Sequence, residues 1–93
     1  MQQLRSRAVC ATSEAILSFL TERQFVRPHR RLGDVMIDLH QATGACELAV
    51  NRAMEWLKLD AAAPVGRLRR TELTQLSRSI HRFWRAAVHH TDA

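Results

Sequence analysis

The stretch from Leu39 to Trp56 reads LHQATGACELAVNRAMEW and decides how the chain folds. Gly44 divides it into two runs in which apolar residues recur at helical spacing. Glycine readily adopts the left-handed conformation that ends a helix, so Gly44 predicts a tight turn. Small and branched apolar residues fall where two crossing helices need inward side chains: Leu39, Ala45, Val50 and Ala53. The stretch therefore predicts two short helices that cross at Gly44.

Outward from this pair, the apolar periodicity predicts four helical segments and no strand. They run from about Leu4 to Glu22, Leu32 or Asp34 to Gln41, Ala45 to Leu59, and Thr71 to His89. Pro28 should end the first segment near Arg27, because the residue before a proline avoids helical geometry. Residues 60–66 should form a connector, since Pro64 and Gly66 both break helices.

Two residues are predicted to help start their helices. Asp34 either caps the second segment or lies in its first turn, where its charge suits the helix dipole. Thr71 is predicted to cap the fourth segment, with Glu72 in the first turn. Trp56 and Trp84 should anchor the core, because each can bury a large apolar area.

Length and composition predict one all-α domain over residues 1–93. The chain has 93 residues, 46% of them hydrophobic, with 3 glycines, 2 prolines and no tyrosine. Such a mix favours helices. No apolar run approaches the ~18 residues of a membrane span, and the start lacks the features of a secretory signal, so we expect a cytoplasmic protein. Cys10 and Cys46 lie far apart and are expected to be free thiols.

The fourth segment carries the most regular apolar stripe. Its members repeat at alternating steps of three and four residues: Leu73, Leu76, Ile80, Phe83 and Ala87. One interpretation is the core-facing side of a helix in a four-helix domain. The other is the interface of a homodimer, because the spacing is that of a heptad. The sequence leaves both open.

The run GACELAVNRAMEWL, which begins at Gly44, resembles the turn and recognition helix of bacterial repressors of the helix-turn-helix superfamily. Their common form is Gly, an apolar residue, Ser, several polar residues, Val, a polar residue, Arg, Ala and Leu. The resemblance covers only Leu39 to Trp56, and His40 stands where those proteins carry a small residue. It implies a four-helix domain with a helix-turn-helix pair, and a DNA-binding regulator of transcription.

The resemblance also implies roles for individual residues. Outward positions of the recognition helix would be Glu47, Leu48, Asn51, Arg52 and Glu55. Glu47, Asn51 and Arg52 would contact DNA, with Asn51 reading adenine and Arg52 reading guanine or a phosphate. Backbone phosphates would be held from one side by Arg27, Arg30 and Arg31. They would be held from the other side, where a winged variant carries its wing, by Arg67, Arg69 and Arg70.

The charge balance favours an acidic partner. The chain has 14 Lys and Arg against 9 Asp and Glu, a net charge of +5. Besides double-stranded DNA, an acidic protein or ribonucleoprotein surface would fit. Glu47 and Glu55 favour a helical protein-interaction module, such as an adaptor, an anti-activator or a phage-type inhibitor of host defence. A small RNA-binding subunit of a ribonucleoprotein is a further alternative. A continuous positive face around Arg52 would favour DNA, and an apolar or acidic face a protein.

Nothing in the chain predicts catalysis, a cofactor or a metal. Neither Cys-x-x-Cys nor His-Glu-x-x-His spacing occurs, so the histidines are interpreted as solvated helix-face residues. Cys46 lies near a predicted helix N-terminus, which lowers the pKa of a thiol, but no histidine is placed to orient it. Nucleophile elbows and glycine-rich phosphate loops are also missing. We therefore expect a binding protein rather than an enzyme.

Overall fold

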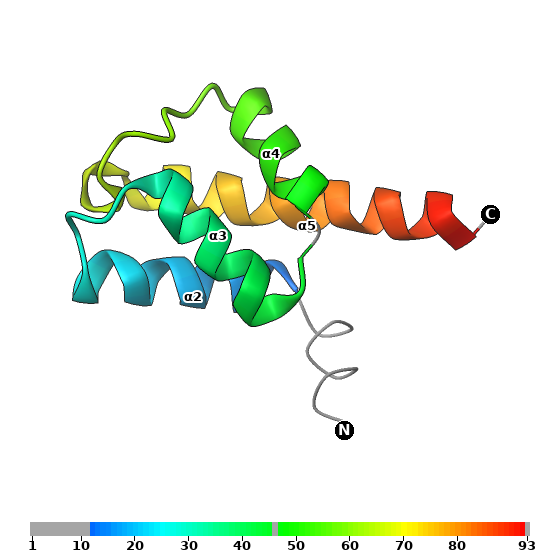
Figure 1. Ribbon diagram of the computed structural model, residues 1–93, viewed down its shortest axis with the longest axis horizontal. Helices are drawn as coiled ribbons and strands as arrows, with labels where there is room; N and C mark the ends of the chain where they lie inside the picture. The colour runs from blue at the N-terminus through cyan, green and yellow to red at the C-terminus, as the bar shows by residue number, and fades with distance from the viewer. Residues whose placement is uncertain (1–11, 46, 93) are drawn as a thin grey trace.

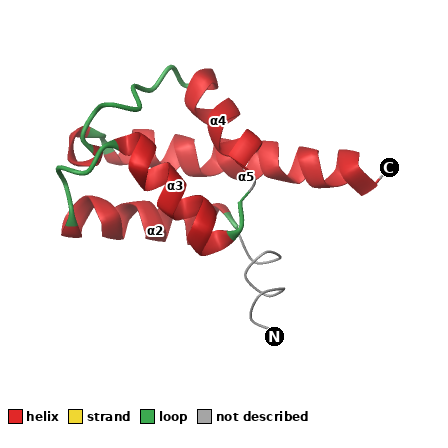
Figure 2. Cartoon of the chain, in the orientation of Figure 1, coloured by secondary structure: helices red, strands yellow, loops and turns green. Residues whose placement is uncertain are grey.

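Four α-helices and one 3-10 turn make up the computed structural model, which describes residues 12–45 and 47–92, with side chains up to residue 86 (Figures 1 and 2). In chain order they are α2 (Ser13–Val26), α3 (Leu32–Thr43), α4 (Glu47–Trp56), η1 (Val65–Arg67) and α5 (Arg70–Asp92). No strand occurs among the described residues. The predicted all-α, four-helix fold is confirmed.

The long helix α5 is the support on which the others pack. Figure 1 shows α2 running beside α5, α3 crossing in front of them, and α4 lying against the middle of α5. The C-terminal part of α5 projects beyond the other helices. Among the described residues, no helix is both long and apolar enough to cross a bilayer.

The core forms where the apolar faces of all four helices meet. Its large, fully buried side chains include Ile16, Leu20, Leu32, Val35, Leu39, Val65, Leu73, Leu76 and Ile80. Those on α2, α3 and α5 repeat at three- and four-residue steps, which is the spacing that places residues on one face of a helix. The inward positions predicted around the turn, Ala45, Val50 and Ala53, are buried as well.

The stripe on α5 faces this core and is not a dimer interface. Leu73, Leu76 and Ile80 are buried inside their own chain, so they have no surface to offer a second copy. Phe83 is half-buried against the same core, and the side chain of Ala87 lies outside the described part. The interpretation of the stripe as a homodimer interface is therefore wrong for its first three residues, and the core-facing interpretation holds there.

Helix α2 ends as Pro28 predicts, with Arg27 as its C-cap. The helix continues to Val26, beyond the predicted end at Glu22, and its first described turn is capped by Thr12, whose side chain accepts a hydrogen bond from the Ala15 N–H. The predicted start at Leu4 lies outside the described residues.

Helix α4 ends three residues before the predicted Leu59, because a lysine takes the place usually held by glycine. Lys58 has a positive φ of 55°, in the left-handed region. The Lys58 N–H donates to the Glu55 carbonyl and the Leu59 N–H donates to the Met54 carbonyl. This is the hydrogen-bond pattern that closes helices at a left-handed residue. A lysine does not normally indicate the end of a helix in a sequence, so the predicted helix is three residues too long.

Helix α5 begins one residue before the predicted cap, Thr71. The helix includes Arg70, and the Arg69 N–H donates to Oε1 of Glu72 over 2.7 Å. Glu72 thus satisfies one of the N–H groups that a helix start leaves without a partner. Glu72 lies in the first turn, as predicted. It also caps the start of the helix, which is the role predicted for Thr71.

The connector pairs with the segment before α3 and forms no wing. N–H groups of Leu32 and Gly33 donate to the carbonyls of Ala63 and Ala61, each over 2.8 Å, and the Val65 N–H donates to the Arg30 carbonyl over 2.8 Å. The connector thereby caps α3, whose start no described side chain caps, while Asp34 lies in its first turn. A winged variant needs a β-hairpin, but residues 60–69 hold only an isolated bridge and η1.

A glutamine ties the connector to α2. The side-chain amide of Gln24 donates to the carbonyls of Val65 and Leu68, over 3.0 and 2.7 Å. The Gly66 N–H donates to the Pro28 carbonyl over 2.9 Å in the same region. The chain is thus held together at the end where α5 begins.

Candidate macromolecule-binding surfaces

The turn between α3 and α4 is held by local hydrogen bonds. Gly44 has a φ of 77°, and its N–H donates to the His40 carbonyl. Thr43 Oγ1 donates to the Leu39 carbonyl and accepts from the Ala45 N–H. The exposed His40 ring donates from Nδ1 to the Ala45 carbonyl. The bulky ring is therefore accommodated outside the crossing of the two helices, where it helps to bridge the turn.

The outward face of α4 is where the sequence analysis placed it. Its predicted members are all exposed: Glu47, Leu48, Asn51, Arg52 and Glu55. Ala49, Val50 and Ala53, on the opposite side, are buried. The orientation of this helix is confirmed, whereas contacts of Glu47, Asn51 and Arg52 with DNA stay predictions.

Trp56 lies on this outward face and not in the core, so its predicted burial is wrong. Its side chain is 70% exposed. Trp56 follows Leu48 and Arg52 at four-residue steps, which places the three on one side of the helix. Leu48 is itself 53% exposed. The other tryptophan, Trp84, is half-buried.

Trp56 forms one side of a groove between α4 and α5. Its ring meets the ring of Phe83 edge-on, with centroids 6.4 Å apart and planes at 72°. The groove has a volume of about 680 Å³ and is lined by Leu48, Asn51, Arg52, Glu55, Trp56 and Phe83. A smaller hollow of about 130 Å³ lies on the α3 side of α4 and includes Ile37, His40 and Glu47. Helix α4 thus lies between two recesses.

The two arginine clusters do not flank α4 as predicted. Residues 28–33 pair with residues 61–66, which brings Arg31 and Arg67 to one end of the molecule. Figure 1 shows that end at the start of α5, whereas α4 lies farther along α5. The expected placement on two sides is therefore not what the structure has, whereas contacts of these arginines with phosphates stay predictions.

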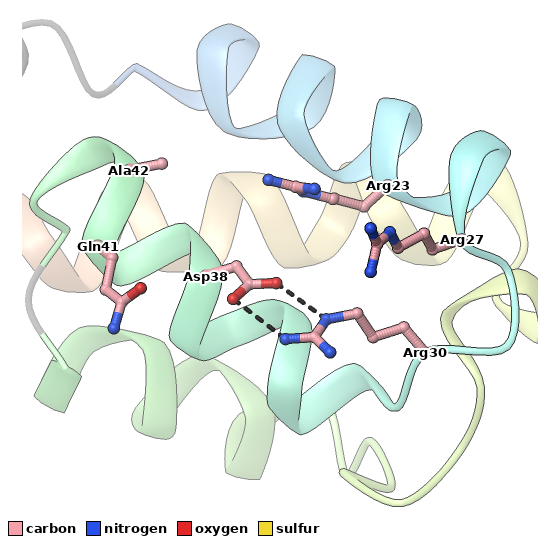
Figure 3. Close-up of a pocket in the computed structure, with 6 residues that line it drawn as sticks. All are labelled: Arg23, Arg27, Arg30, Asp38, Gln41 and Ala42. Carbon is pink, nitrogen blue, oxygen red and sulfur yellow. Dashed lines mark hydrogen bonds and ion pairs between the residues drawn. The ribbon is translucent and has the colours of Figure 1, made fainter.

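Arg30 is occupied by an ion pair within the chain. Its Nε lies 2.9 Å from Oδ2 of Asp38, and its terminal nitrogen 3.2 Å from Oδ1, so both carboxylate oxygens are used (Figure 3). The hydrogen bond with Asp38 raises the pKa of Arg30 above its ordinary value. The Asp38 carboxylate neutralises the charge of this guanidinium, which weakens its attraction for the DNA phosphate assigned to it.

A basic stripe on α5 escaped the sequence analysis. Arg78, Arg82 and Arg85 are exposed and follow each other at steps of four and three residues. No acidic residue lies between Leu73 and Ala86, so nothing on this part of α5 offsets their charge. The spacing of these arginines and the absence of acidic residues between them are visible in the sequence and could have predicted the stripe.

Histidines do not gather at a metal site in the described part of the chain. No three His, Cys, Asp or Glu side chains there lie close enough to share an ion. His29 and His40 are exposed, and His81 lies near the Trp84 ring. His89 and His90, and the thiols of Cys10 and Cys46, lie outside the described side chains.

Comparison with known protein families, with curated proteins and with solved structures finds no match for this chain. What its surfaces can bind is therefore inferred from their own chemistry. The fold defines a small all-α domain with a helix pair joined at Gly44. Its surface carries an aromatic groove beside α4 and a separate basic stripe along α5.

Proposed function

We propose that this protein is a helical interaction module that binds a partner protein in the groove between α4 and α5. The observation that carries the proposal is the exposure of Trp56 beside Leu48 and Phe83. Tryptophan is enriched among the residues that dominate binding energy at protein interfaces, because it buries a large area with few rotatable bonds. The edge-on contact with Phe83 holds the ring in place before any partner arrives.

The charges around the groove favour a protein over a nucleic acid. Arg52 lies between Glu47 and Glu55 along α4. Those carboxylates would repel the phosphates of a duplex pressed against the helix. A protein surface can instead present both signs of charge around an apolar centre. We infer that the occupant is an amphipathic helix whose apolar side contacts Leu48 and Trp56.

Two exposed aromatic residues allow a matched test of the groove. Trp56 lines it, whereas Phe25 is 87% exposed at the end of α2 and lines none of the recesses described above. A photoreactive phenylalanine analogue at position 56 should crosslink a partner in host cells, and the same analogue at position 25 should not. With that partner purified, Trp56→Ala should weaken binding at least about tenfold, or ~1.4 kcal/mol. Phe25→Ala should change the dissociation constant less than about twofold.

Two results would contradict this proposal. Crosslinks from both positions to the same proteins would mean that the groove has no special role. Crosslinks only to a second copy of the chain, with a dimer by light scattering that Trp56→Ala dissociates, would make the groove a self-association surface.

Double-stranded DNA is a second candidate, favoured by the exposure of Asn51 and Arg52 on the helix after the Gly44 turn. If α4 reads a duplex, a salt-sensitive gel shift should appear with a defined sequence, and Arg52→Ala should weaken it about 10-fold or more. Arg78→Ala serves as the control on α5. Equal losses from both variants, without sequence preference, would point to backbone binding, as in a ribonucleoprotein subunit, and count against a DNA reader.

A further inference from the structure

We propose that the cleft between α2 and α3 is a binding site for a phosphate monoester, held by Arg23 and Arg27. The cleft has a volume of about 450 Å³ and is lined by Arg23, Arg27, Arg30, Asp38, Gln41 and Ala42. Figure 3 shows the side chains of Arg23 and Arg27 extending into the space between the two helices. This site is separate from the groove of α4 and α5, and it does not depend on the proposed function.

The charges in the cleft do not cancel. Arg30 and Asp38 neutralise each other through two hydrogen bonds. No ion pair of Arg23 or Arg27 occurs in the described part of the chain, so both keep their positive charges without a carboxylate partner. Two like charges in one cleft repel each other, and an anion between them would remove that repulsion.

Arg23 also has a polar atom that the protein leaves unsatisfied. Its Nε is buried and has no hydrogen-bond partner among the described residues. A buried donor without an acceptor costs about 1–3 kcal/mol, and more when the group is charged. The guanidinium lies over the Phe19 ring, 4.8 Å from its centroid, which restrains it in this unfavourable position. A turn of the Arg23 side chain toward the cleft would bring Nε within reach of an oxyanion, which would supply the missing acceptor.

The chemistry of the two arginines selects the ligand. A guanidinium presents a planar fork of donors that matches the oxygens of a phosphate or carboxylate. Two such forks with two uncompensated charges suit a dianion, which a phosphate monoester is above its second pKa of about 6. A phosphodiester carries a single charge and would leave one guanidinium uncompensated. Gln41, which lines the same cleft, adds an amide that can donate to a third oxygen.

The test is a titration of the full chain, labelled with ¹⁵N, that follows the arginine Nε–H resonances at constant ionic strength. Inorganic phosphate should shift the Arg23 resonance saturably, and dimethyl phosphate should bind at least about tenfold more weakly. A titration with adenosine monophosphate distinguishes an organic phosphate monoester from inorganic phosphate as the ligand of the cleft. Tighter binding than inorganic phosphate would indicate an organic monoester as the ligand, and equal binding would indicate phosphate alone.

Variants locate the site. Arg27→Gln, at an exposed side chain, should weaken phosphate binding about tenfold or more without unfolding the protein. Arg23→Gln should do the same, and Arg78→Gln, on the basic stripe of α5, should have no effect. The proposal would be overturned by a resonance that moves no more with phosphate than with chloride, by equal binding of the diester, or by equal losses in all three variants.

Discussion

Replacing Leu76 with alanine is expected to lower the free energy of unfolding by about 2–5 kcal/mol, the cost of emptying a buried leucine site. Leu76 is fully buried on α5, in the core to which all four helices contribute. Domains of this kind are stable by only about 5–15 kcal/mol, so the loss would be a large share of the total. Urea unfolding followed by circular dichroism would measure it.

The same experiment checks that the α5 stripe belongs to the core of a single chain. Gln75→Ala is the control, because Gln75 is exposed on the same helix and its loss should change stability by less than about 0.5 kcal/mol. A residue buried within its own chain gives a destabilisation that is independent of protein concentration. Two observations would instead place Leu76 in a contact between subunits. The unfolding midpoint would rise with protein concentration, and Leu76→Ala would destabilise the protein only at high protein concentration.

Replacing Gly66 with alanine should destabilise the protein by about 1–3 kcal/mol, the usual range for inserting an atom into occupied space. A Cβ at this position would lie 2.7 Å from the Pro28 Cβ and 2.9 Å from the Pro28 carbonyl oxygen. Both are parts of a rigid residue, so the backbone itself must move. That movement would break the hydrogen bond from the Gly66 N–H to Pro28 and loosen the pairing that caps α3.

Gly33 offers the matched control. A Cβ at Gly33 would lie 3.2 Å from the Ala61 Cβ and 3.3 Å from the Ala61 carbonyl oxygen, contacts that small shifts of the exposed connector can relieve. Gly33 lies within α3, where alanine gains about 1 kcal/mol in helix propensity. Gly33→Ala should therefore change stability by less than about 1 kcal/mol. Thermal or urea unfolding in which the two variants behave alike would contradict the close contact between the connector and Pro28.

The helix pair shows what local sequence can determine. Leu39, Val50 and Ala53 are buried and Asn51 and Arg52 are exposed, as their spacing around Gly44 predicts. Each of these predictions depends on a period of 3.6 residues and on one left-handed glycine. Lys58, which has the same left-handed conformation at the end of α4, was missed because its residue type gives no sign of it.

The candidate sites were less predictable, because they depend on which distant segments meet. Trp56 was predicted to be buried because tryptophan usually is, yet Ala53 and Met54 occupy the inward side of α4 and leave it outside. Arg23 was not singled out at all. It becomes part of a cleft only when α3 places Asp38 and Gln41 opposite α2.

Sequence alone thus determined the all-α class, the break at Gly44 and the faces of the helices, because these follow from periodicity and backbone preference over a few residues. Tertiary structure alone decided that the connector pairs with residues 28–33, that the α5 stripe is core and that Arg30 is neutralised by Asp38. The first two outcomes join segments far apart in the chain, and the third joins the loop before α3 to a residue within that helix. They depend on which apolar surfaces are buried against each other and which charged groups meet. No single stretch of sequence specifies either.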